Sequence, residues 1–106
     1  MTTITKDKAK NYLKGVEGAT CFYCQDGSVF CNLRDLLRAL KNMPEDIFYY
    51  HSNKDKSDFY QWIKNVFGDE KLAEHFWRYR EKRAKLYQVL YDHLEDLERA
   101  ARGKTF

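Results

Sequence analysis

The fold of this chain is decided by the stretch HSNKDKSDFYQWIKNVFGDEKLA, residues 51 to 73 of 106. Ser57 or Asp58 can cap a helix there, because each side chain accepts a hydrogen bond from a backbone N–H of the first turn. That helix carries an apolar stripe at spacings of three and four residues. The stripe consists of Phe59, Trp62, Ile63 and Val66. Gly68 ends the helix and Asp69 caps another, so the stretch predicts a polar loop followed by two helices.

The helix that Asp69 begins keeps apolar side chains on one face until Gly103. These side chains are Leu72, Phe76, Tyr79, Leu86, Leu90, Leu94, Leu97 and Ala101. A continuous helix over residues 69–102 would be about 50 Å long at 1.5 Å per residue, whereas a domain of this size has a radius of gyration of about 13 Å. We therefore expect the long helix to overhang, to bend or to meet a partner.

The part of the chain before His51 predicts one helix, one hairpin and further helices. Residues 1–18 contain a short amphipathic helix. Residues 20–31 are expected to form a β-hairpin, because they contain Asp26-Gly27, a dipeptide typical of the two-residue type I′ turn. Residues 32–67 form a helical core that begins with a helix capped by Asn32. We therefore predict a mainly α-helical single domain over residues 1–106, with one β-hairpin near the N-terminus and a long C-terminal helix over residues 69–102.

Composition favours a globular domain outside the membrane. Hydrophobic residues make up 43% of the chain and charged residues 33%, with a formal net charge of +3. The longest apolar runs fall far short of the roughly 20 residues that cross a bilayer, and residues 1–14 lack the apolar region of a signal peptide. We expect a cytoplasmic protein without a membrane partner.

Three cysteines, Cys21, Cys24 and Cys31, raise the question of a zinc site with His51. A two-residue turn at Asp26-Gly27 would place Cys24 and Cys31 on one face of the hairpin and Cys21 on the other. Thiols split in this way cannot converge on one ion. We therefore expect no metal site and no cofactor, and we interpret the cysteines as small, partly buried apolar residues in a reducing compartment.

The polar residues His51, Asn53 and Asp58 have two interpretations. They could form a ligand corner, with a titrating histidine beside the free amides of a helix N-terminus. Alternatively, His51 caps one helix, Asn53 turns the chain and Asp58 caps the next helix. We favour the structural interpretation because each residue type has an ordinary local use at its position. An enzyme that uses His51 or a cysteine is a third and weaker alternative, and we expect no catalytic residue.

The segment from Trp77 to Lys85 interleaves aromatic and basic side chains, as surfaces that bind nucleic acid do. Residues 71–85 contain six basic and two acidic residues, whereas residues 92–99 contain four acidic residues and one basic residue. Two copies of the helix crossing antiparallel would therefore set opposite charges against each other. The expected interaction helix comprises Trp77, Arg78, Tyr79, Arg80, Lys82, Arg83, Tyr87, Leu90, Leu94 and Leu97.

A pattern within the opening stretch resembles a family of small prokaryotic domains of unknown function that are frequent in archaea. The pattern is H-x-N-x4-D-F-x2-W-I-x2-V-x-G-D-x2-L-A, from His51 to Ala73. The resemblance extends over about Thr20 to Phe76, and members of the family often have Ser-Leu where this chain has Asn32-Leu33. The cysteines and the tail from Trp77 onward lie outside the pattern. The resemblance implies no activity.

From these observations we predict a non-enzymatic interaction or regulatory module. We expect it to form a homodimer or to capture a helical protein partner through its C-terminal helix. The alternative is a protein that binds nucleic acid through residues 78–85 and the lysine-rich N-terminus. Binding that weakens steeply between low and physiological salt would favour this alternative.

Overall fold

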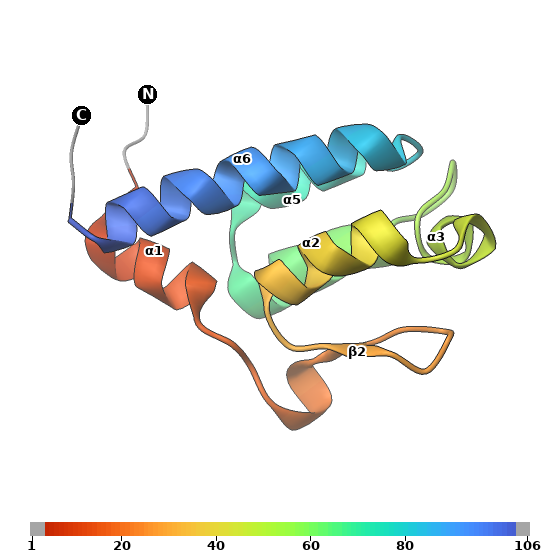
Figure 1. The fold of residues 1–106 in the computed structure, drawn as a ribbon, viewed down its shortest axis with the longest axis horizontal. Helices are drawn as coiled ribbons and strands as arrows, with labels where there is room; N and C mark the ends of the chain where they lie inside the picture. Colours follow the sequence, from red (N-terminus) through yellow and green to blue (C-terminus); the bar gives the residue numbers. More distant parts are fainter. Residues whose placement is uncertain (1–3, 104–106) are drawn as a thin grey trace.

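The computed structural model describes residues 4–103, and it begins with helix α1 (Lys6–Leu13). A 3₁₀ turn, η1 (Gly18–Thr20), leads into an antiparallel hairpin of β1 (Phe22–Tyr23) and β2 (Val29–Phe30) (Figure 1). The remaining elements are α2 (Leu33–Asn42), α3 (Glu45–His51), α4 (Asp58–Trp62), the π-helical turn η2 (Ile63–Phe67), α5 (Glu70–Arg78) and α6 (Arg83–Ala101). The predicted fold class, mainly helical with one hairpin near the N-terminus and a long C-terminal helix, is confirmed.

Helix starts lie where the capping residues predict them. The side chain of Asn32 accepts from the backbone N–H of Asp35 at 2.8 Å, and Ser57 accepts from Tyr60 at 3.1 Å. Asp69 accepts from the N–H of Leu72 at 3.3 Å. Each such cap stabilises its helix by about 1 kcal/mol. Gly68, with a φ of +72°, then separates η2 from α5 in the left-handed conformation that glycine adopts without strain.

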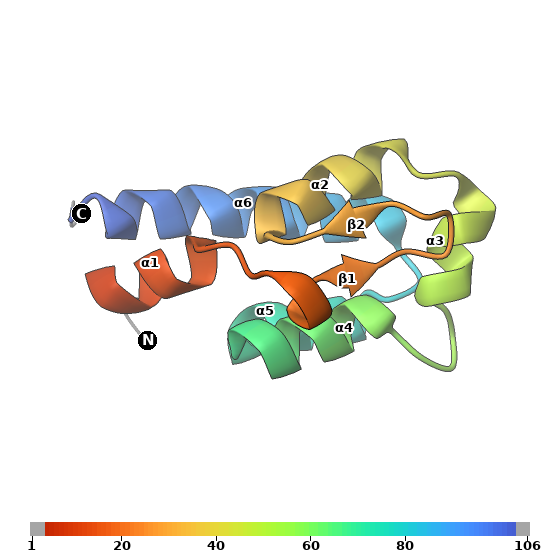
Figure 2. The same ribbon diagram turned by 90° about the horizontal axis from the view of Figure 1, so that it is seen from below.

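The predicted helix over residues 69–102 is interrupted after Arg78. Residues 79–82 form a turn in which the Lys82 N–H donates to the Tyr79 carbonyl at 2.8 Å, and α6 then runs back beside α5 (Figures 1 and 2). The turn contains neither glycine nor proline. The reversal is instead favoured by tertiary packing, because it lets the apolar side chains of both α5 and α6 enter one core. The predicted long helix is therefore two separate helices joined by a turn, which of the three expected outcomes is nearest to a bend.

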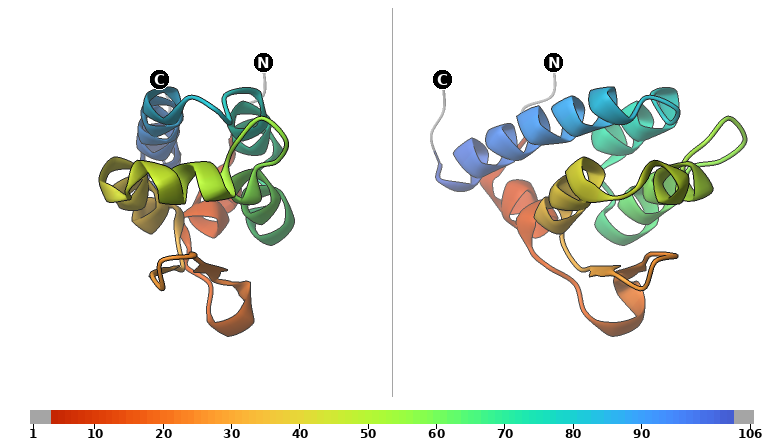
Figure 3. Two further views of the ribbon diagram at one scale, coloured as in Figure 1. Left: turned by 90° about the vertical axis from the view of Figure 1, so that its right-hand side faces the viewer. Right: turned by 45° about the vertical axis from the view of Figure 1, so that its right-hand side comes forward.

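The core lies between α6 and the other helices. Its fully buried side chains include Leu36, Phe48, Phe59, Ile63, Leu72, Phe76, Leu86 and Leu90. Helix α6 lies over α1 and α2, whereas the hairpin lies on the side of the molecule away from α6 (Figures 1 and 3). The molecule measures 40 × 28 × 22 Å, with a radius of gyration of 13.4 Å. The apolar stripe of α6 is therefore covered by its own chain.

The hairpin register differs by one residue from the prediction. Phe22 pairs with Phe30 and Tyr23 with Val29, and the Cys24 N–H donates to the Ser28 carbonyl. The loop thus has three residues, 25–27, and its last residue is a glycine with a φ of +93°, as three-residue loops with a bulge require. Two bonds to the Asp26 carboxylate stabilise the turn, from the Ser28 N–H at 2.9 Å and the Ser28 hydroxyl at 2.6 Å.

This register corrects the interpretation of the cysteines. Cys21 and Cys31 come opposite each other with their Cα atoms 4.5 Å apart, and they form a disulfide. Such a separation is typical of a non-hydrogen-bonded pair in an antiparallel ladder. Cys24 is a buried free thiol. The prediction that Cys21 points away from Cys31 was wrong because it assumed a two-residue loop, and a slip of one residue exchanges the two faces of a strand.

Candidate functional site

His51 lies at the end of α3 and connects three parts of the chain. It is 4% exposed. Its Nε2 accepts from the Gln25 N–H at 3.0 Å, and its Nδ1 lies 2.9 Å from a carboxylate oxygen of Asp58. The ring proton must therefore be on Nδ1, from which it is donated to Asp58. Both ring nitrogens are occupied by the protein itself, and the imidazole joins the hairpin loop to the start of α4.

Asn53 shapes the loop between α3 and α4. Its side-chain oxygen accepts from the N–H groups of Asp55 at 3.0 Å and Lys56 at 3.3 Å, while its amide donates to the Tyr49 carbonyl at 2.8 Å. The structure brings the three residues of the predicted ligand corner together in this region. The polar atoms described here bond to the chain itself, and Asn53 turns the chain as the structural interpretation expects. The capping roles expected of His51 and Asp58 were wrong, because Ser52 ends α3, Ser57 caps α4 and the His51 ring bonds to Gln25 and Asp58 instead.

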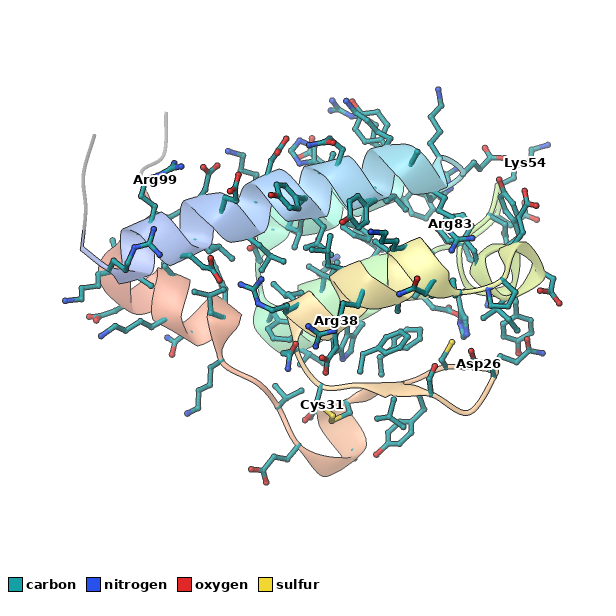
Figure 4. All side chains as sticks on the ribbon, in the orientation of Figure 1. Asp26, Cys31, Arg38, Lys54, Arg83 and Arg99 are labelled. Atoms are coloured by element: carbon teal, nitrogen blue, oxygen red, sulfur yellow. A yellow bond between two sulfur atoms is a disulfide. The ribbon has the colours of Figure 1, made fainter. Side chains whose placement is uncertain are left out.

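The basic segment between α5 and α6 is engaged largely with the protein. The Arg80 guanidinium donates twice to the Lys54 carbonyl, at 2.9 and 3.2 Å. Arg83 donates to the Leu40 carbonyl at 2.6 Å and also to the Met43 carbonyl, at the C-terminus of α2 (Figure 4). Arg78 pairs with Glu74 at 3.1 Å. These arginines therefore do not form a continuous stripe of free charge for a phosphate backbone.

The leucines of the expected interaction helix lie in the core. Leu90 and Leu97 are fully buried and Leu94 is 3% exposed. Of the aromatic residues expected on that helix, Trp77 is 41% exposed, while Tyr79 and Tyr87 are half-buried. In this conformation the leucines contribute to stability and only the aromatic and charged residues are available to a partner.

A buried pair that the sequence analysis missed joins α5 to α6. His93 Nε2 lies 2.5 Å from a carboxylate oxygen of Asp69, and the two residues are 7% and 3% exposed. The pair fixes the N-terminus of α5 against α6. Burial raises the pKa of the nearby Tyr12, and the charges of Asp69 and Glu70 raise it further. Only the capping role of Asp69 could be predicted, because the two partners lie 24 positions apart in the sequence and no local pattern signals their contact.

An aromatic groove lies between α4 and α5, and we name it the α4–α5 groove. Its volume is about 380 Å³, and it is lined by Tyr60, Lys64, Glu70, Ala73, Glu74 and Trp77. The centroids of the Tyr60 and Trp77 rings are 5.4 Å apart, with the ring planes inclined at 49°. Ala73 is 2% exposed. The groove therefore combines two aromatic walls with two carboxylates and the ammonium of Lys64.

The aromatic walls of this groove already contact positive charges. The Arg80 guanidinium lies 4.0 Å from the centroid of the Trp77 ring, and the Lys64 ammonium lies 5.6 Å from that of Tyr60. Both distances are within the roughly 6 Å over which a cation is attracted to the face of an aromatic ring. Both aromatic walls are thus already in contact with cationic side chains of the chain itself.

A second groove of about 370 Å³ lies between β2 and α2. Its charged groups include Asp26, Asp35 and Arg38, and Arg38 bonds to Asp35 at 2.6 Å (Figure 4). The guanidinium is already paired with a carboxylate of the same helix, and Phe30 is the only aromatic residue among those that line this groove. In residues 4–103 no cluster of histidine, cysteine and acidic side chains has the arrangement of a metal site.

Comparisons with known protein families, with curated proteins and with solved structures found no match to this chain. The resemblance of the stretch from His51 to Ala73 therefore stays a prediction. Among the described residues, no helix has the length and apolar character needed to cross a membrane.

Proposed function

We propose that this protein is a non-enzymatic interaction module that binds a positively charged segment of a partner protein in the α4–α5 groove. The observation that carries the proposal is the pair of aromatic walls, Tyr60 and Trp77, beside the carboxylates of Glu70 and Glu74. An arginine or lysine side chain matches this chemistry, because its charged head can contact the rings and the carboxylates while its apolar stem packs on Ala73.

The energetic terms favour a moderate affinity for such a segment. A cation over an aromatic face contributes about 0.5 to 2 kcal/mol, depending on how far it is desolvated. Because Arg80 and Lys64 already contact these rings, the net gain per incoming side chain is smaller than the gross contact energy. A segment with several basic residues is therefore a better ligand than a single free amino acid.

The geometry gives less support to the alternatives. Glu70 and Glu74 would repel a phosphate backbone at the groove, and Arg80 and Arg83 are held by backbone carbonyls. A helical partner docking on the leucine stripe of α6 would have to displace α1 and α2. Homodimer formation stays a prediction that light scattering can test. A cytoplasmic location also stays a prediction, and the Cys21–Cys31 disulfide is more typical of an oxidising compartment.

Isothermal titration calorimetry with an arginine-rich peptide tests the proposal. We expect Trp77→Ala, and separately the double change Glu70→Gln with Glu74→Gln, to weaken binding about tenfold, or about 1.4 kcal/mol. Tyr91→Ala is the matched control, because Tyr91 is 43% exposed but lies on α6 away from the groove. A peptide with glutamate in place of arginine should not bind.

Two results would contradict the proposal. One is equal affinity of the wild type and both groove variants for the basic peptide, with circular dichroism confirming that all of them fold. The other is tight, salt-dependent binding of single-stranded nucleic acid by the wild type together with no binding of the basic peptide, which would favour the alternative function.

A further inference from the structure

The disulfide of Cys21 and Cys31 closes the base of the hairpin. Cys21 is 7% exposed and Cys31 is half-buried. The Cys31 carbonyl also accepts from the Val16 N–H at 2.7 Å, so the segment that enters the hairpin is held to Cys31, the residue after β2, by one covalent bond and one hydrogen bond. Figure 4 shows the sulfur atoms of this bridge at the label of Cys31. The disulfide thus fixes the position of the backbone at residues 20 and 21.

That backbone supports α4 directly. The Trp62 indole N–H donates to the Thr20 carbonyl at 2.8 Å, one residue before the disulfide. Trp62 is 7% exposed, and its ring contacts those of Phe22 and Phe67. Helix α4 and the π-helical turn η2 that continues it have five residues each, too few for a helix that is stable on its own, so such contacts determine where they lie. Tyr60, a wall of the α4–α5 groove, stands on this same helix.

We propose that the Cys21–Cys31 disulfide is a redox latch that controls the α4–α5 groove, an inference that rests on the proposed function. In the oxidised protein the Thr20 carbonyl is held against Trp62, and α4 presents Tyr60 opposite Trp77. In the reduced protein the 3₁₀ turn that carries Thr20 loses its covalent link to Cys31 and keeps only the neighbouring Val16 hydrogen bond and the pairing of Phe22 with Phe30. Its bond to Trp62 then weakens, and the two aromatic walls lose their fixed separation.

The reductant is a dithiol, and the exchange is balanced. One of its thiolates attacks the more exposed Cys31 sulfur, the S–S bond breaks and Cys21 leaves as a thiolate. The second thiol of the reductant then displaces Cys31 from the mixed disulfide. Two electrons pass to the protein, both cysteines end as thiols after taking up two protons, and the dithiol becomes a disulfide. Cys24 takes no part, because burial raises the pKa of its thiol and lowers its thiolate content.

The test measures binding of the same arginine-rich peptide to the oxidised protein and to the protein reduced with dithiothreitol. Thiol titration after denaturation should find one free cysteine before reduction and three afterwards. We expect reduction to weaken binding about fivefold, or about 1 kcal/mol. Cys21→Ser with Cys31→Ser should bind like the reduced protein under both conditions. Cys24→Ser is the control and should keep the full response to reduction.

A second measurement tests the latch independently of peptide binding. In ¹H–¹⁵N spectra of the wild type, reduction should shift the Trp62 indole N–H signal and speed its hydrogen exchange, because that group bonds to Thr20. An unmoved Trp62 signal overturns the latch. Equal peptide affinity of the oxidised and reduced proteins also overturns it while leaving the proposed function intact. Absence of peptide binding in both states, with a shifted Trp62 signal, overturns the proposed function and removes the groove as the latch's target.

Discussion

At the scale of single residues, the polar side chains that first suggest a site serve mainly to join elements. His51 is the clearest case, because each of its ring nitrogens has a partner on a different segment of the chain. A buried imidazole with one donor and one acceptor satisfied in this way resembles a structural cross-link rather than a group poised for catalysis.

Replacement of His51 tests this interpretation. His51→Ala leaves the Gln25 N–H without its acceptor, leaves the Asp58 carboxylate with only the Lys56 ammonium, and opens a cavity beside Phe22 and Phe59. We expect the free energy of unfolding to fall by about 3 kcal/mol, measured by urea denaturation. His75→Ala, at a half-buried position, is the control and should cost much less. A fully stable His51→Ala protein that loses binding of a ligand would instead support the ligand corner.

Local chemistry predicts some residue roles and misses others. The caps at Asn32, Ser57 and Asp69 follow from side chains that bond to the backbone three residues ahead. The contacts of Asp69 with His93 and of Arg80 with Lys54 cross 24 and 26 residues. Nothing in a local pattern specifies such partners, because they depend on how the helices pack.

At the scale of secondary structure elements, the turn between α5 and α6 is held from outside. The Ser52 hydroxyl donates to the Arg80 carbonyl at 2.5 Å, and Arg83 reaches the C-terminus of α2. The spacing of the apolar residues alone predicts one continuous helix, because residues 69–102 contain no glycine or proline that would break it. The hairpin shows the same limit, because Asp26-Gly27 suits both a two-residue and a three-residue loop and the Ser28 contacts favour the latter.

Arg83 tests how the turn is held. Arg83→Ala removes two hydrogen bonds from a charged donor to the Leu40 and Met43 carbonyls, and we expect it to lower the free energy of unfolding by about 2 kcal/mol. Lys85→Ala is the control, because Lys85 is exposed and its ammonium lies over the ring of Tyr79. Equal stability of the two variants in urea denaturation would show that the turn does not depend on Arg83.

His75 on α5 predicts a pH dependence of stability. Burial lowers the pKa of His75 from its ordinary value of 6.5, and the positive charges of Lys71 and Arg78 lower it further. The folded protein therefore binds this proton less tightly than the unfolded chain, and stability falls as the pH drops through the unfolded-state pKa toward the lower folded one. His75→Gln should reduce this loss below about pH 6.5 and leave the melting temperature near pH 8 unchanged. Melting curves that differ by the same amount at every pH would refute this account.

At the scale of the whole molecule, the apolar stripe that first suggests a partner closes the protein's own core. An apolar face nine turns long can be buried either by another chain or by folding back, and the reversal at residues 79–82 achieves the second. The fold class and most helix boundaries could be predicted from periodicity and caps. The α4–α5 groove could not, because Tyr60 and Trp77 meet only after α4 and α5 pack together.

The central claim, that the α4–α5 groove binds a positively charged segment, is tested most directly by ¹H–¹⁵N NMR. The chain has two tryptophans, one at the groove and one buried beneath the hairpin, so their indole N–H signals are distinct reporters. During titration of the oxidised protein with the arginine-rich peptide, we predict that the Trp77 signal shifts in a saturable way while the Trp62 signal moves little. A Trp77 signal that stays fixed while other regions of the spectrum shift would contradict the account.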